Sequence, residues 1–294
     1  IFTYWLFSEL HLDYMVIEVG LGGRLDPTNV MTRSDKVCVI TDIGFDHTEI
    51  LGNTLASIAA EKAGIIAESS DVVMYEQSNE VMLAVEKAIV ANNATLTLIQ
   101  GDVDVKNLQK LPLFQQRNCQ LAKRAVEIRL HLDNRAGLST AAFTRSLDIT
   151  IPGRFEVISK DGVTIILDSA HNPQKIGSLV DAVKNMYTNR SMIYVVSFGV
   201  NKRQSIVEML QTVKSCGAGR LITTQFTLDA SESHQAISAD DIWLVAQQVG
   251  YPATASLTDP IPALTAAVMY ANVYTALIVA TRSFSLVSNL RGLL

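Results

Sequence analysis

Cysteine, an excess of positive charge and long apolar runs are all scarce in this sequence of 294 residues. The three cysteines, Cys38, Cys119 and Cys216, lie far apart and form no CxxC pair, so the sequence indicates neither a disulfide framework nor a zinc site. We expect free thiols in a reducing cytoplasm. Lys and Arg number 24 against 29 Asp and Glu, and the net charge of −5 supplies no broad basic surface for nucleic acid or an anionic membrane.

The sequence also lacks the signals of a secreted or membrane-inserted protein. No apolar run approaches the roughly 18 residues of a membrane span, and no secretion signal is recognisable at the start of the chain. The sequence therefore predicts a cytoplasmic protein, which we expect to be a monomer. The chain opens with Ile1 rather than Met, within an apolar and aromatic run over residues 1–7. We expect that an upstream part is missing.

Length and composition favour two well-packed domains. Of the residues, 48% are hydrophobic and 18% are charged, which argues against disorder. The segment Ile151-Pro152-Gly153 breaks the periodicity, so we place the boundary at about residue 150 and expect domains over 1–150 and 151–294.

Apolar runs of strand length alternate with segments of helical period, which predicts an α/β fold with parallel sheets covered on both faces. Such sheets bind ligands beyond the carboxyl ends of their strands. The positions of interest therefore follow Val19, Thr41, Leu167 and Ser197. The expected strands are 14–19, 36–41, 71–75, 95–99, 163–167, 192–197, 220–223 and 276–280, and the expected helices are 54–66, 79–91, 115–131, 174–186, 204–214, 239–249 and 261–271.

Two candidate ligands follow the first two predicted strands. Glu18 precedes the glycine-rich segment 20–26 (GLGGRLD), which fails as a dinucleotide fingerprint because its sixth position is Leu25. The segment suits a cation or a phosphate, and the alternative is a tight turn with a solvated Glu18. His47 follows the second strand, where an imidazole and the Glu18 carboxylate can share a divalent metal. The alternative for His47 is a purely structural role.

Three further residues carry candidate chemistry. Lys62 lies late in an apolar helix, where it is either a surface lysine or a deprotonated amine that reacts with carbon dioxide to form a metal-binding carbamate. Arg154, at the domain junction, offers a planar fork for phosphate or a hinge salt bridge. Asp168 ends a strand and suits ribose hydroxyls, while Asn172 beyond it suits a helix cap.

Five ordered segments resemble the folylpolyglutamate synthase/dihydrofolate synthase family, a branch of the Mur-type ATP-dependent amide ligases. They are 13–29 (DYMVIEVGLGGRLDPTN), 46–52 (DHTEILG), 61–65 (EKAGI), 152–155 (PGRF) and 167–173 (LDSAHNP). The resemblance implies a Mur-ligase-like central ATP-binding domain, incomplete because its phosphate loop is missing, over 1–150. A Rossmann-like C-terminal glutamate-ligase domain would occupy 151–294.

The resemblance also implies a reaction and a set of roles. ATP converts a carboxylate of a folate or of dihydropteroate into an acyl phosphate, which the amino group of L-glutamate attacks. Domain closure would bring Mg²⁺ and Arg154 to the moving phosphate from opposite domains. The implied roles are magnesium binding by Glu18 and His47, carbamylation of Lys62, adenine contact by Asn118, phosphate and ribose contacts by Arg154 and Asp168, and glutamate binding by His171 and Ser283.

The sequence departs from the family at its nucleotide-binding features. No GxxxxGK[ST] phosphate loop is found, so we expect the chain as given to bind ATP poorly and to lack ligase activity alone. Arg203 and Gln204 follow Lys202 where the family carries a Lys-Asp pair, and Arg282 stands where Gly is common. The alternatives are a Mur-type ligase for another carboxylate and a non-catalytic paralogue without the phosphate loop.

Overall fold

The computed structural model describes residues 2–101, 108–215, 219–226, 235–251, 253–281, 284–292 and 294. Contacts divide the chain into two compact units, Ile1–Asp148 and Ile149–Leu294, next to residue 150 where the sequence predicts a boundary. The assignment of these units to the two Mur-ligase domains stays a prediction. Among the described residues, no helix combines the length and apolar character needed to cross a bilayer.

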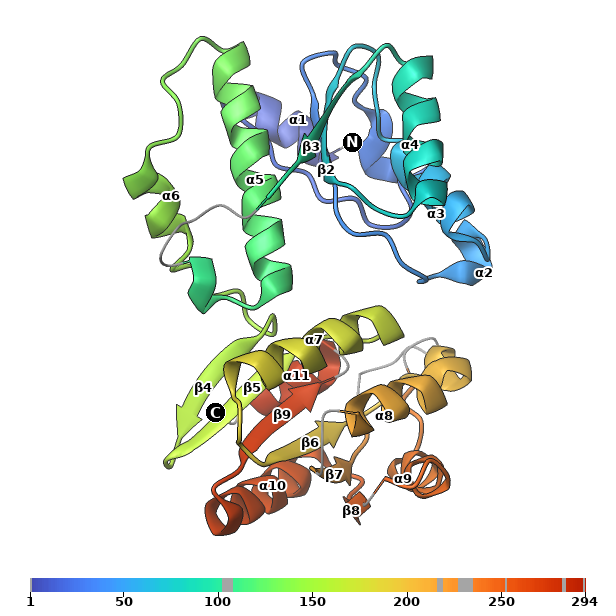
Figure 1. Ribbon diagram of the computed structural model, residues 1–294, viewed down its shortest axis with the longest axis vertical. Helices are drawn as coiled ribbons and strands as arrows, with labels where there is room; N and C mark the ends of the chain where they lie inside the picture. Colours follow the sequence, from blue (N-terminus) through green and yellow to red (C-terminus); the bar gives the residue numbers. More distant parts are fainter. Residues whose placement is uncertain are drawn as a thin grey trace. The chain divides into compact units, whose positions relative to one another are not determined.

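The first unit is built on a three-stranded parallel sheet in the order β1-β2-β3, of which Figure 1 labels β2 and β3. Residues alternate between its faces: Val72 and Met74 pack with α3 and α4, whereas Val73 and Tyr75 pack with α5. Thr54 caps the start of α3 through a reciprocal capping box with Ser57. The elements are α1 (Phe2–Glu9), η1 (Pro27–Val30), β1 (Val37–Ile40), α2 (Thr48–Leu51), α3 (Leu55–Ala63), β2 (Asp71–Tyr75), α4 (Asn79–Ala91), β3 (Thr95–Ile99), η2 (Leu108–Lys110), α5 (Leu113–Leu132) and α6 (Thr140–Ser146).

The prediction of a strand over residues 14–19 is wrong. This segment is not part of the sheet, and Val16 is 96% exposed. Side chains hold its start instead, since the Tyr14 hydroxyl donates to Asp133 Oδ2 at 2.7 Å and Arg135 stacks over the Tyr14 ring. A local apolar pattern shows that a segment can form a strand, but only a pairing partner makes it one.

The second unit contains a six-stranded sheet in the order β4-β5-β9-β6-β7-β8. Four of its five strand pairings are parallel, as predicted, and the fifth joins the edge strand β4, which the sequence analysis does not predict, antiparallel to β5. The elements are β4 (Glu156–Lys160), β5 (Val163–Asp168), α7 (Pro173–Met186), β6 (Met192–Val196), η3 (Val200–Ser205), α8 (Ile206–Lys214), β7 (Arg220–Thr223), α9 (Ala239–Gln248), β8 (Ala253–Ser256), α10 (Pro260–Tyr274), β9 (Leu277–Thr281) and α11 (Phe284–Arg291).

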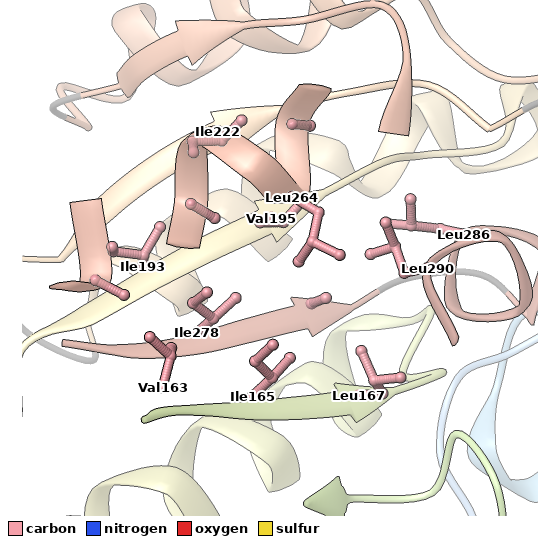
Figure 2. Close-up of a cluster of buried hydrophobic side chains, with 14 of the residues drawn as sticks. Val163, Ile165, Leu167, Ile193, Val195, Ile222, Leu264, Ile278, Leu286 and Leu290 are labelled. Atoms are coloured by element: carbon pink, nitrogen blue, oxygen red, sulfur yellow. The ribbon is translucent and has the colours of Figure 1, made fainter. Parts of the chain in front are cut away.

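One face of this sheet forms a continuous apolar core with α10 and α11. Ile165 and Leu167 of β5, with Ile278 of β9, point toward Leu264 and Leu290 of those helices (Figure 2). Every residue of β6 and β9 is buried, as expected for strands covered on both sides.

The helices that follow β5 and β9 lie on opposite faces of the sheet. Helix α11 packs in the core just described, whereas α7 packs beside α8 on the side away from α10 (Figure 1). Asp168 at the end of β5 pairs in register with Thr281 at the end of β9. The chain therefore separates between these two strand ends, which is where open α/β sheets bind ligands.

Candidate functional site

The glycine-rich segment 20–26 packs its backbone against the end of α3. A Cβ on Gly23 would lie 2.7 Å from the Glu61 carbonyl oxygen and 2.9 Å from that of Lys62. The Arg24 amide donates to the Glu61 carbonyl at 2.8 Å, and the Arg24 guanidinium contacts the Glu61 carboxylate at 2.6 Å. Gly64 makes the reciprocal approach, since a Cβ there would lie 2.6 Å from Arg24 Cα. The absence of a side chain at Gly23 and Gly64 thus allows the backbones of this segment and of α3 to approach closely.

The same segment also contacts α2, and its last residue, Asp26, caps the start of η1. Gly22 has a φ of +67°, and a Cβ there would lie 2.9 Å from Leu51. Asp26 accepts hydrogen bonds from the amides of Leu21 and Thr28 at 2.8 and 2.9 Å. Burial raises the pKa of the Asp26 carboxyl, but the hydrogen bond from the Thr28 hydroxyl, together with the backbone amide bonds, outweighs burial and lowers the pKa overall.

His47 and Lys62 share Asp46 as a neighbour. His47 Nε2 lies 3.9 Å from Asp46 Oδ1, and His47 Nδ1 lies 3.8 Å from Glu49 Oε1. Burial lowers the pKa of the Lys62 ammonium, and the charge of Asp46 opposes this shift only in part. A lowered pKa increases the neutral fraction of an amine.

The other predicted residues of the first unit are exposed. Glu18 lies in the segment without strand pairing, and Asn118 lies on the exposed side of α5. Within the described part of the chain, no three His, Cys, Asp or Glu side chains form a metal-binding group. The metal-ligand roles of Glu18 and His47 remain predictions.

Sequence reasoning missed a cluster around Arg117 at the carboxyl ends of β1 and β2. Its guanidinium donates to both Asp42 oxygens, at 2.6 and 3.0 Å, and stacks 3.8 Å above the Tyr75 ring. The Tyr75 hydroxyl donates to the buried Gln120 at 2.8 Å. Gln77 holds the same loop, because its Oε1 accepts from the Ile43 amide at 2.7 Å. This cluster ties α5 to the loop that leads into His47.

In the second unit, residues 152–155 fold over the end of β5. Gly153 has a φ of +69°, and a Cβ there would lie 2.8 Å from Val287 of α11. The Gly153 amide donates to Glu156 at 2.8 Å, and its carbonyl accepts from the Ser169 amide at 2.9 Å. These bonds fix the position of Arg154, whose guanidinium donates to the Ser169 hydroxyl.

Asp168 is buried at this strand end. Its two oxygens accept hydrogen bonds from the amides of Phe155, at 2.8 Å, and Ala170, at 2.7 Å. Burial raises the pKa of the Asp168 carboxyl, and these hydrogen bonds, with the nearby charge of Arg154, offset the rise only in part.

His171 lies two residues beyond Ser169, just before α7. Its Nδ1 lies 2.9 Å from the Ser169 carbonyl oxygen, and its Nε2 lies 3.2 Å from Lys175 Nζ. Asn172 caps α7 by accepting from the Lys175 amide at 2.8 Å, the structural role that its position predicts. The structure thus brings Arg154, Asp168 and His171 together at one strand end, whereas Ser283 lies outside the described residues.

Two further polar residues at this edge are not among the predicted site residues. The hydroxyl of Ser197, just after β6, is fully buried and has no hydrogen-bond partner among the described residues. Lys175 contacts His171 from one turn along α7, and only the i,i+4 spacing could have indicated that contact.

Comparison with known proteins identifies relatives. Residues 153–280 match the family described as Mur ligase, glutamate ligase domain. Dihydrofolate synthetase of Saccharomyces cerevisiae is 31% identical over 233 residues, covering 70% of this chain and 54% of that protein. The dihydrofolate synthase/folylpolyglutamate synthase of Bacillus subtilis is 30% identical over 233 residues, covering 70% and 53%. The chain spans about half the length of the curated relatives it matches.

Solved structures give the same result for the fold. Folylpolyglutamate synthase of Mycobacterium tuberculosis, complexed with ADP and AMPPCP, aligns with a TM-score of 0.81 at 23% identity, covering 98% of this chain and 70% of that one. Escherichia coli FolC in complex with DHPP and ADP aligns with a TM-score of 0.78 at 25% identity, covering 98% and 68%. The predicted Mur-ligase-like α/β fold is confirmed, and the chain belongs to the folylpolyglutamate synthase/dihydrofolate synthase family of Mur ligases.

Proposed function

We propose that this protein is an ATP-dependent ligase that joins the amino group of L-glutamate to a carboxylate of tetrahydrofolate, of dihydropteroate or of both. Relatives that are 31% and 30% identical carry the names of such synthases, which supports the proposal. ATP, when bound, supplies the phosphoryl group that turns a carboxylate into a reactive acyl phosphate. The observation that carries the proposal is the grouping of Arg154, Asp168 and His171 at the end of β5.

Arg154 and Asp168 have the chemistry to hold the nucleotide. A guanidinium has five donors, so Arg154 can contact phosphate oxygens while it donates to Ser169. Each Asp168 oxygen accepts one backbone amide and keeps a lone pair for a ribose hydroxyl. These features support phosphate binding by Arg154 and ribose binding by Asp168.

His171 is suited to bind the incoming amino acid and to accept its proton. Its Nδ1 faces a carbonyl oxygen, which only accepts, so Nδ1 carries the ring proton and Nε2 carries a lone pair. The α-ammonium of L-glutamate transfers a proton to Nε2, and the freed amine lone pair forms the new C–N bond as phosphate leaves. Ser283 is the second residue that the family resemblance proposes for this amino acid.

The first unit supplies the remaining proposed roles. The lowered pKa of Lys62 increases the fraction of neutral amine, whose nitrogen bonds to the carbon of carbon dioxide and loses a proton to give a carbamate. Glu18 and His47 offer carboxylate and imidazole ligands for Mg²⁺, which commonly takes only one or two protein ligands beside water and phosphate oxygens. Asn118, exposed on α5, is proposed to contact the adenine.

The test measures phosphate release by the full-length natural protein in the presence of ATP, Mg²⁺, L-glutamate, and either dihydropteroate or tetrahydrofolate. We expect release that requires all components, with a product heavier than the folate by one glutamate residue. Arg154→Ala should reduce turnover at least tenfold while the circular dichroism spectrum is retained. Release that is independent of glutamate or of the folate would contradict the proposed function.

A further inference from the structure

A lysine and a histidine form a contact at the start of α7 that none of the proposed roles uses. Lys175 Nζ lies 3.2 Å from His171 Nε2, one helical turn away. His171 precedes the Asn172 cap, and Lys175 donates its own backbone amide to that cap. The helix start therefore fixes the backbone of both residues.

The hydrogen-bond pattern determines which group donates. The Ser169 carbonyl oxygen accepts a hydrogen bond from Nδ1–H of His171, so Nε2 of the neutral ring carries a lone pair. An ammonium has donors and no acceptor, so Lys175 donates to that lone pair. A second ring proton would face the ammonium directly. The contact thus consists of a neutral imidazole that holds a charged lysine.

The position of Lys175 adds positive charge where the helix already has it. The first turn of α7 contains no acidic residue and begins with Pro173, while the amides of this turn carry the positive end of the helix dipole. The positive end of the helix dipole repels a cation at this position, so a bound anion would lower the energy of the Lys175 ammonium. Arg154 adds a further positive charge at the same end of β5, through its bond to Ser169.

We propose that Lys175 is the residue that binds a carboxylate of the amino-acid substrate, and that His171 holds its ammonium in place until the substrate arrives. This inference rests on the proposed ligase function. When the carboxylate takes the Lys175 ammonium, the lone pair of His171 Nε2 becomes available to the substrate amine. Lys175 thus makes proton acceptance by His171 depend on a correctly placed acidic amino acid.

The test compares four forms of the full-length natural protein: wild type, Lys175→Met, Lys175→Arg, and Lys184→Met in the last turn of the same helix. We expect Lys175→Met to raise KM for L-glutamate at least tenfold, with kcat and KM for ATP changed less than threefold. Lys175→Arg should restore KM to within threefold of wild type, and Lys184→Met should match wild type. An unchanged KM for glutamate in Lys175→Met overturns the inference.

A second comparison identifies which carboxylate Lys175 binds. L-glutamine and the α-amide of L-glutamate each have a neutral amide in place of one carboxylate. The Lys175→Met variant should lose the preference for glutamate over one of these two compounds. Retention of both preferences overturns the inference. If wild type shows no glutamate-dependent turnover, the proposed function itself fails. If wild type is active and Lys175→Met matches it, only the assignment of Lys175 fails.

Discussion

The contacts of Arg117 predict a measurable energetic link between α5 and the loop after β1. Arg117→Met keeps an unbranched apolar stem but removes the fork that contacts Asp42 and the charge above Tyr75. The Asp42 pair is partly exposed, with side-chain accessibilities of 31% for Arg117 and 44% for Asp42. An exposed ion pair contributes about 0.2–1 kcal/mol, and the two-pronged geometry favours the upper part of that range.

Stacking on Tyr75 adds about 0.5–1 kcal/mol. We therefore expect Arg117→Met to lower the free energy of unfolding of the first unit by about 1–2 kcal/mol. A double-mutant cycle with Asp42→Asn should return a coupling of about 0.5–1 kcal/mol, and a cycle with Tyr75→Leu a similar value. Because about 1 M salt shortens the Debye length to about 3 Å, added salt should weaken the first coupling more than the second.

Amide hydrogen exchange of peptides from β2 and α5 is the suitable assay, because it reports opening of the first unit separately from the second. Arg124→Met is the matched control on the same helix. Arg124 is half-exposed and lies 3.7 Å from Glu127, so its loss should change stability by less than about 0.5 kcal/mol. Couplings to Asp42 and Tyr75 both below about 0.3 kcal/mol would refute the reasoning.

Three other substitutions, one of them paired with a control substitution, test the first unit. Gly64→Ala should cost about 1–3 kcal/mol, because its Cβ meets the Arg24 backbone, while Gly137→Ala, with open space around it, should be close to neutral in the same exchange assay. Asp26→Ala should lower the free energy of unfolding by about 1–2 kcal/mol in the same assay, because it removes the acceptor of the hydrogen bonds from the Leu21 and Thr28 amides. In buffer free of carbon dioxide, Lys62→Met should stabilise the fold at pH 7, and this gain should shrink as the pH rises toward 10.5. Between the lowered pKa of Lys62 and 10.5 the unfolded chain binds more protons, so wild-type stability rises with pH; a constant difference would contradict the burial of Lys62.

The sequence predicts best those elements whose signals are local. The strands 71–75 and 95–99 and the helix 79–91 have the predicted bounds, because apolar period and flanking polar residues define them without reference to the rest of the chain. The segment 14–19 carries the same local signal but forms no strand. Its failure shows that pairing is a property of two segments and cannot be read from one.

Contacts between distant residues explain the other differences. The glycines of segment 20–26 indicate close backbone approach, but only the structure identifies the end of α3 as what approaches them. Arg117 and Asp42 are separated by 75 residues, so no spacing rule connects them. Lys175 and His171, by contrast, are one helical turn apart, and a search for i,i+4 polar pairs beside candidate site residues could have found them.

The burial of Asp168 links the electrostatics of the second unit to ligand binding. Two backbone amides already donate to this carboxylate, yet its pKa remains above the ordinary value because burial outweighs them. The charged form is therefore incompletely stabilised in the free protein, and an additional hydroxyl donor would lower its energy more than it would that of a solvated carboxylate. A ligand that donates here binds the ionised form preferentially, so its affinity should rise with pH through the pKa of Asp168 and then become constant. Because the amides of Phe155 and Ala170 come from the two loops that meet at the end of β5, the backbone itself holds the carboxylate ready for such a donor.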